Sequence, residues 1–143
     1  MCIRDRIQTV DSFENAYAIS RRAGKIDRVI PILLEVNIGL ETGKSGIEPD
    51  FEVIKETVRK ISGLKFIRLN GLMTMGPVTS DPKRLIPYFK NTRLIFDRLN
   101  SLKLNDVYLQ ILSMGMSDSY KIAIDEGSNM IRLGSVLFGP RHT

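Results

Sequence analysis

The sequence predicts an α/β fold built on a parallel β-sheet, and two observations carry that prediction. Short apolar runs of strand length alternate along the chain with longer segments whose apolar residues recur at helical spacing. One run, VIPILLEVN at residues 29–37, is almost continuously apolar, which is typical of a strand buried on both faces. Recurring strand–helix units give a parallel sheet, so the fold is either a small doubly wound open sheet or part of a (β/α)₈ barrel.

The first expected unit begins with a short apolar strand at residues 7–10. Asp11, with Glu14 three residues later, resembles an acidic capping box that starts a helix ending near Gly24. One face of this helix is expected to carry Phe13, Ala16, Tyr17 and Ser20. The strand at residues 29–37 then completes the first strand–helix–strand unit.

A polar, glycine-rich loop at residues 38–47 leads into the second expected helix. Pro49 suits the first turn of that helix, and Gly63 lies just beyond its end. Apolar residues at helical spacing between them are Phe51, Ile54, Val58 and Ile61.

The second half of the chain repeats this alternation. The expected strands are Phe66–Met75, Val107–Leu112 and Met130–Leu137. Asp81 and Pro82 start a long helix whose apolar positions are Leu85, Phe89, Phe96 and Leu99. Ser117 or Asp118 is expected to cap a short helix that ends at Gly127. The count is about five strands, whereas a closed barrel needs eight.

Composition narrows the class of protein. A chain of 143 residues with 43% hydrophobic and 26% charged residues fits one globular domain, and it contains no apolar run of membrane-spanning length and no signal-peptide pattern. The net charge is +5, but the basic residues are scattered among acidic ones, so we expect no nucleic-acid partner. The single cysteine, Cys2, fits a cytoplasmic location. Residues 1–6 match no pattern that follows, so we expect a non-native leader there and a single domain over residues 7–143.

Two glycine- and serine-containing runs carry the candidate chemistry. They are ILSMGMSD at residues 111–118 and IRLGSVLFG at residues 131–139. Glycine amides, serine hydroxyls and a helix N-terminus together make a cradle for an anion such as phosphate. The spacing alone also allows Ser117 to be only a helix cap and Gly134 to be only a packing glycine.

The motifs together resemble the C-terminal part of the pyridoxal phosphate homeostasis protein family, of the YggS/PROSC type, whose barrel is similar to that of alanine racemase. The matching stretches are TVDS at 9–12, LEVN at 34–37, KSGI at 44–47, NGLM at 70–73, LSMGMSD at 112–118, MIRLGS at 130–135 and FGPR at 138–141. The resemblance implies a partial (β/α)₈ TIM-type barrel, about the last five β-α units, in fold type III of the pyridoxal-phosphate proteins. It implies pyridoxal 5′-phosphate as the cofactor, held by Ser117, Arg132, Gly134 and Ser135.

The resemblance assigns Arg132 to the pyridine nitrogen of the cofactor, with a salt bridge to a carboxylate as the alternative. The family binds the cofactor covalently through a lysine on its first strand, which has no counterpart in this sequence. We expect Lys44 to be a solvated loop lysine, His142 to be incidental, and Met73, Met75, Met114 and Met116 to pack near the mouth of the barrel. No residues have metal-ligand spacing.

The function that the resemblance implies is reversible cofactor binding within intracellular homeostasis, without an identifiable catalytic residue. The implied partners are the small-molecule cofactor and, transiently, cofactor-dependent apoenzymes, with no membrane. One alternative is a fragment of an amino-acid racemase, an enzyme that needs a base on each face of its substrate. Another is an unrelated phosphate-binding α/β domain.

Overall fold

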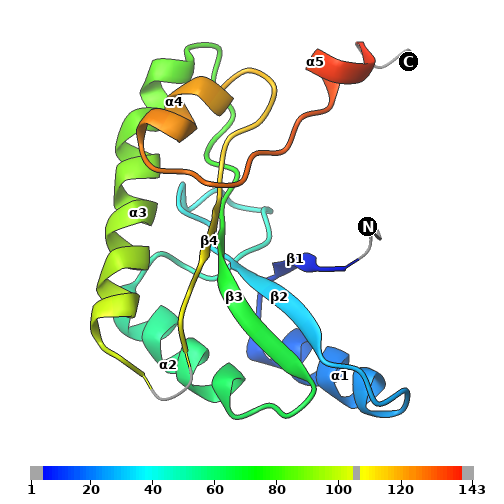
Figure 1. Cartoon of the computed structure of the whole chain (residues 1–143). Helices are drawn as coiled ribbons and strands as arrows, with labels where there is room; N and C mark the ends of the chain where they lie inside the picture. The colour runs from blue at the N-terminus through cyan, green and yellow to red at the C-terminus, as the bar shows by residue number, and fades with distance from the viewer. Residues whose placement is uncertain (1–4, 105–106, 140–143) are drawn as a thin grey trace.

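The computed structural model describes residues 5–104 and 107–139, in which four parallel strands alternate with helices (Figure 1). The strands are β1 (Ile7–Val10), β2 (Ile30–Glu35), β3 (Ile67–Met73) and β4 (Ile111–Ser113). The helices are α1 (Phe13–Gly24), α2 (Phe51–Ser62), the 3₁₀ turn η1 (Pro82–Leu85), α3 (Ile86–Ser101), α4 (Tyr120–Asp125) and α5 (Ser135–Phe138). The strands pair in chain order, β1-β2-β3-β4.

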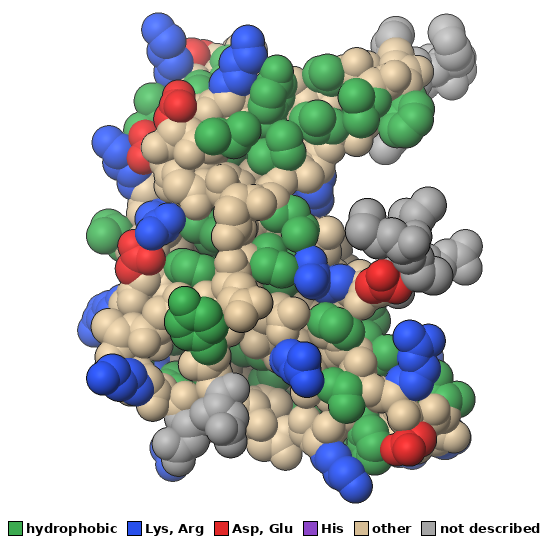
Figure 2. Space-filling model, viewed as in Figure 1, with side chains coloured by type: hydrophobic (Ala, Val, Ile, Leu, Met, Phe, Trp, Pro, Cys, Tyr) green, Lys and Arg blue, Asp and Glu red, His purple; other side chains and the backbone are tan. Residues whose placement is uncertain are grey.

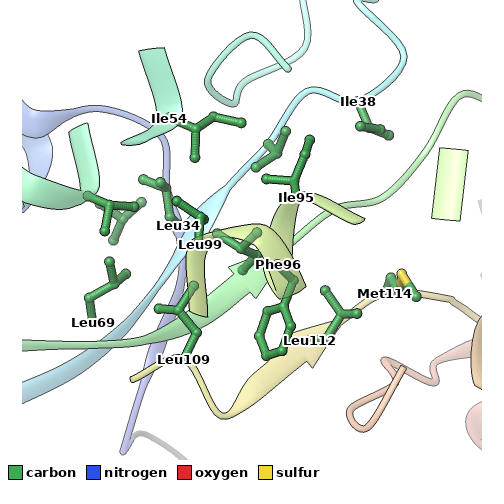
Figure 3. Close-up of a cluster of buried hydrophobic side chains, with 14 of the residues drawn as sticks. Leu34, Ile38, Ile54, Leu69, Ile95, Phe96, Leu99, Leu109, Leu112 and Met114 are labelled. Atoms are coloured by element: carbon green, nitrogen blue, oxygen red, sulfur yellow. The ribbon is translucent and has the colours of Figure 1, made fainter. Parts of the chain in front are cut away.

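The first four α-helices cover one face of the sheet. In register across that face lie Val10, Leu34, Leu72 and Leu112, and all four belong to one buried hydrophobic cluster. The same cluster takes in side chains from α1, α2, α3 and α4, and Figure 3 shows how residues such as Ile54, Phe96 and Leu99 meet the strands. A doubly wound sheet has helices on both faces and a reversal in strand order. Over residues 5–104 and 107–139 the sheet has neither of these features, which indicates part of a barrel.

The opposite, concave face shows how strongly the sheet curves. Glu35, Met73 and Ser113 lie in register there, and each is almost fully buried. The Ser113 hydroxyl donates a hydrogen bond of 2.8 Å to Oε1 of Gln8, which joins β4 to β1. In a flat sheet these two strands would lie about 14 Å apart, three strand spacings, beyond the reach of a serine. The sheet therefore curls as a barrel wall does.

Gly71 sets the distance between β3 and β4. A Cβ added at this position would lie 1.8 Å from the carbonyl oxygen of Ile111, closer than any two such atoms can approach. Glycine is therefore the only residue that permits this strand pairing without a backbone shift.

The expected strand at Met130–Leu137 is wrong. Only Met130 makes a β-bridge, to Ser113, although Arg132 also donates a backbone hydrogen bond of 3.1 Å to the Gly115 carbonyl. At Gly134 the backbone turns out of the extended conformation, and the last apolar residues form α5 instead. The strand expected at Val107–Leu112 is shorter and ends one residue later, because β4 comprises only Ile111–Ser113.

The starts of α1 and α2 also differ from expectation. Ser12, rather than Asp11, caps α1 by accepting a hydrogen bond from the Asn15 amide, and Asp11 instead binds the Asn15 side chain at 2.7 Å. Asp50 caps α2, so Pro49 precedes the helix. Tyr17 is 49% exposed, whereas most of the other expected core positions are buried.

The C-terminal arm of the described chain exposes apolar side chains. Val136, Leu137 and Phe138 of α5 are 55%, 64% and 86% exposed. Figure 2 shows hydrophobic side chains gathered on this arm, at the upper right. In the described ranges, no helix combines the length and the apolar character that crossing a membrane requires. The expected leader at residues 1–6 lies largely outside those ranges and stays a prediction.

Candidate functional site

Ser117 follows β4 and lies against the start of α5. Its hydroxyl accepts hydrogen bonds from the backbone amides of Gly134, at 3.1 Å, and Val136, at 3.4 Å. Ser117 is therefore not the cap of the short helix that follows it, because α4 begins at Tyr120 after Ser119. The structure does bring together the two runs that the sequence singled out.

The residues that carry these amides are exposed. A Cβ added at Gly134 would meet no atom within 4 Å, so packing does not require glycine there. Gly134 and Ser135 are exposed, and the amides from residue 137 onward already donate within the helical turn. Two serine hydroxyls and the first amides of the turn are donors of the kind that bind a phosphate group.

Arg132 is half-buried on the concave side and is held by three acceptors. Its Nη1 donates to the Ser113 hydroxyl at 2.7 Å and to the Ser113 carbonyl at 3.2 Å, and its Nη2 donates to the Thr74 carbonyl at 2.9 Å. Within residues 5–104 and 107–139 it makes no ion pair shorter than 4.0 Å, so the salt-bridge alternative is not found there. Neutral acceptors fix the guanidinium and leave its charge available.

Glu35 is a charged residue of this site that the sequence analysis missed. Burial raises the pKa of the Glu35 carboxyl, nearby Asp11 raises it further, and Arg132 opposes both effects. Burial likewise lowers the pKa of Arg132, and Glu35 opposes that shift. The signal that could have revealed Glu35 is a lone acid at the carboxyl end of an otherwise apolar strand.

Lys44 is not the freely solvated lysine that we expected. Its ammonium group pairs with the Glu41 carboxylate and donates to the Gly76 carbonyl at 3.1 Å. It lines a cavity of about 300 Å³ together with Met75 and Met116.

The other expected residues have mixed outcomes. Met73 and Met114 are fully buried, away from that cavity. His142 and Cys2 lie outside the described residues. Among the described residues no cluster of three His, Cys, Asp or Glu side chains could hold a metal ion.

Comparison with known proteins gives one family match and several close relatives. The model of the alanine racemase N-terminal domain matches residues 2–142. A pyridoxal phosphate homeostasis protein of Aquifex aeolicus is 38% identical over 135 residues, which are 94% of this chain and 58% of that protein. The chain thus spans little more than half the length of such curated relatives.

Solved structures share the fold. PipY of Synechococcus elongatus, in a structure with pyridoxal phosphate bound, superimposes with a TM-score of 0.82 at 30% identity, covering 94% of this chain and 61% of PipY. Alanine racemase of Clostridium difficile, at 20% identity, superimposes with a TM-score of 0.74 over 96% of this chain and 36% of that enzyme. Both matches confirm that the four-stranded sheet is part of an alanine racemase-like barrel.

Proposed function

The chain belongs to the alanine racemase N-terminal domain family, and from this premise we propose that it binds pyridoxal 5′-phosphate reversibly. The observation that carries the proposal is the pair of hydrogen bonds that the amides of Gly134 and Val136 donate to the Ser117 hydroxyl. The amides of Gly134 and Val136 and the hydroxyls of Ser117 and Ser135 would together hold the phosphate. PipY, a relative with this fold, has a solved structure with the same cofactor.

Arg132 serves the other end of the cofactor, the pyridine ring. When bound, the cofactor supplies an electron sink that is strongest when its ring nitrogen is protonated. A guanidinium does not give up its proton, so Arg132 donates a hydrogen bond to that nitrogen without protonating it. This arrangement suits reversible binding, or racemisation, better than transamination.

For the whole protein, the proposed role is to hold the cofactor and to release it to apoenzymes, without turnover of its own. The name of the Aquifex aeolicus relative supports homeostasis over racemisation. The alanine racemase structure shares only the fold at its level of identity, so it favours no reaction.

The test compares ligands that contain different parts of the cofactor. Titrate the 143-residue chain with pyridoxal 5′-phosphate, with pyridoxal and with inorganic phosphate, and measure each dissociation constant by calorimetry. We expect pyridoxal 5′-phosphate to bind at least tenfold more tightly than pyridoxal, because hydrogen bonds to a charged group contribute about 1.5–3 kcal/mol each. Pyridoxal has the same aldehyde but no phosphate, so its titration also measures the imines that any exposed lysine can form. Equal affinities for the two, or no binding, would contradict the proposal.

A further inference from the structure

The Ser113 hydroxyl links Gln8 on β1 to Arg132 beyond β4. Ser113 is fully buried, and its Oγ donates to Gln8 Oε1 at 2.8 Å while it accepts from Arg132 Nη1 at 2.7 Å. A hydroxyl has a single hydrogen. Because that hydrogen goes to Gln8, only the lone pairs of the Ser113 oxygen can face the guanidinium. Gln8 therefore fixes the rotation of the hydroxyl, with its hydrogen turned away from the guanidinium and a lone pair turned toward it.

The guanidinium plane is fixed by acceptors that are themselves held in place. The Thr74 carbonyl accepts from Nη2. Thr74 is itself held on both sides. Its amide donates to the Ser113 carbonyl at 3.0 Å, and its hydroxyl donates to the Val36 carbonyl at 2.8 Å. Both Nη1 hydrogens and one Nη2 hydrogen are used by these contacts. An arginine has five donors, so among the described residues one Nη2 hydrogen and the Nε hydrogen have no acceptor and can meet a ligand.

We infer that Gln8 and Ser113 are positioning residues that hold Arg132 in the orientation in which it meets the cofactor ring. The inference rests on the proposed function for the identity of the ligand. The chain of hydrogen bonds from Arg132 through Ser113 to Gln8, here called the relay, does not depend on that function. Arginine has a large conformational freedom, and a ligand that must order it loses affinity. The relay orders the guanidinium before the ligand arrives. It also makes ring recognition depend on β1, whose Gln8 lies 105 residues before Ser113.

The variant Gln8→Met tests the relay, because methionine keeps the length of the side chain and removes the acceptor. Gln8 is half-buried, so methionine can be accommodated. We expect affinity for pyridoxal 5′-phosphate to fall about 2- to 12-fold, the range for a neutral hydrogen bond, with affinity for inorganic phosphate unchanged. Gln8→Glu retains an acceptor and is expected to restore the affinity. Gln110→Met, an exposed position at the start of β4, is the matched control.

A second measurement needs no ligand. In nitrogen-15 spectra of the ligand-free chain, we expect separate Arg132 Nη signals that show restricted rotation. These should merge in Gln8→Met and in Ser113→Ala, and separate again in Gln8→Glu. Unchanged Arg132 signals in both variants would overturn the inference, and so would an equal loss of cofactor and phosphate affinity. Failure of the unmodified chain to bind either ligand would instead contradict the proposed function and leave the spectra to decide the relay.

Discussion

At the scale of single residues, the proposed phosphate site depends on Ser117. Its hydroxyl oxygen accepts from the amides of Gly134 and Val136, the groups that we propose hold the phosphate. We expect Ser117→Ala to weaken binding of pyridoxal 5′-phosphate by about 1.5–3 kcal/mol, because a hydroxyl that donates to a charged oxygen is lost. The measurement is a calorimetric titration, with the exposed Ser62→Ala as control. Unchanged or tighter binding would mean that Ser117 only competes with the ligand.

Arg132 is expected to act on the ring alone. Arg132→Leu should weaken binding of pyridoxal 5′-phosphate while leaving inorganic phosphate binding nearly unchanged, because its contacts run to Ser113 and Thr74 and not to the amides near Ser117. The same titration, repeated with both ligands, separates the two ends of the site. If Ser117→Ala and Arg132→Leu both leave cofactor affinity unchanged, the site has been assigned wrongly.

Glu35 gives the molecule a predictable dependence on pH. Burial and Asp11 raise its pKa in the folded chain, so the folded state holds the proton more tightly than the unfolded state does. The contribution to stability is complete below the unfolded pKa and is lost as the pH rises through the raised folded pKa. We therefore expect Glu35→Gln to increase the free energy of unfolding near pH 7 and to have little effect near pH 4. Denaturant melts at both pH values check this, and a gain that is equal at both would contradict it.

Lys44 offers no ready nucleophile for the cofactor aldehyde. Its ammonium donates to Glu41 and Gly76, and an ammonium has no free lone pair. We expect borohydride reduction of the chain with one equivalent of pyridoxal 5′-phosphate, followed by peptide mapping, to give scattered, substoichiometric labelling. Stoichiometric labelling of one lysine would show that this chain builds a specific covalent site.

The sequence could predict part of this site, and the reason is local. Ser117, Gly134 and Ser135 lie in short motifs whose residue types already suggest anion binding, and the structure brings them together. Glu35 and Gln8 belong to no such motif. Their roles depend on which residues of distant strands share the concave face, and that information is absent from any single segment.

At the scale of elements, Gly71 is the glycine at which one added methyl group should lower the free energy of unfolding most. Its Cβ would lie 1.8 Å from the Ile111 carbonyl oxygen, so Gly71→Ala must push β3 and β4 apart. We expect a loss of about 1–3 kcal/mol or more in the free energy of unfolding, the usual range for overpacking. Gly63→Ala is the matched control, because its Cβ would lie 3.5 Å from the Lys60 carbonyl, an ordinary contact. Equal effects of the two variants in denaturant melts would refute this account.

Helices were easier to predict than strands. Helical spacing identified the buried faces of α2 and α3 correctly, including Ile54, Val58 and Leu99. The prediction of a last strand is wrong because the segment MIRLGSVL is apolar enough to form either a strand or a helix. The apolar pattern does not reveal that Gly134 turns the chain, nor that Val136 would remain exposed.

At the scale of the whole molecule, the described chain exposes surfaces that a closed barrel would cover. Within the described residues β1 pairs only with β2, and α5 exposes three apolar side chains. An open strand edge beside apolar surface promotes association. We expect low stability and concentration-dependent self-association, measured by sedimentation velocity between micromolar and millimolar concentration. A monomer at all concentrations with a sharp cooperative melt would contradict this expectation.

The fold class was predictable because it depends on repetition. Strand–helix alternation indicated a parallel sheet, but it left open-sheet and barrel closures undecided. The choice between them depended on which face the helices cover, and only the shared cluster of α1 to α4 shows that face.

The chain-order pairing of the strands also implies a sequence of events during synthesis. Each of these strands leaves the ribosome after the strand that it pairs with, so the pairs β1-β2, β2-β3 and β3-β4 can form in that order. Contacts between neighbouring units close short loops and form quickly. The bond between Gln8 and Ser113 spans 105 residues and cannot form until β4 has been made. The curl of the described sheet therefore comes after the pairing of neighbouring strands, and Arg132 can reach Ser113 only when the segment beyond β4 has also been made.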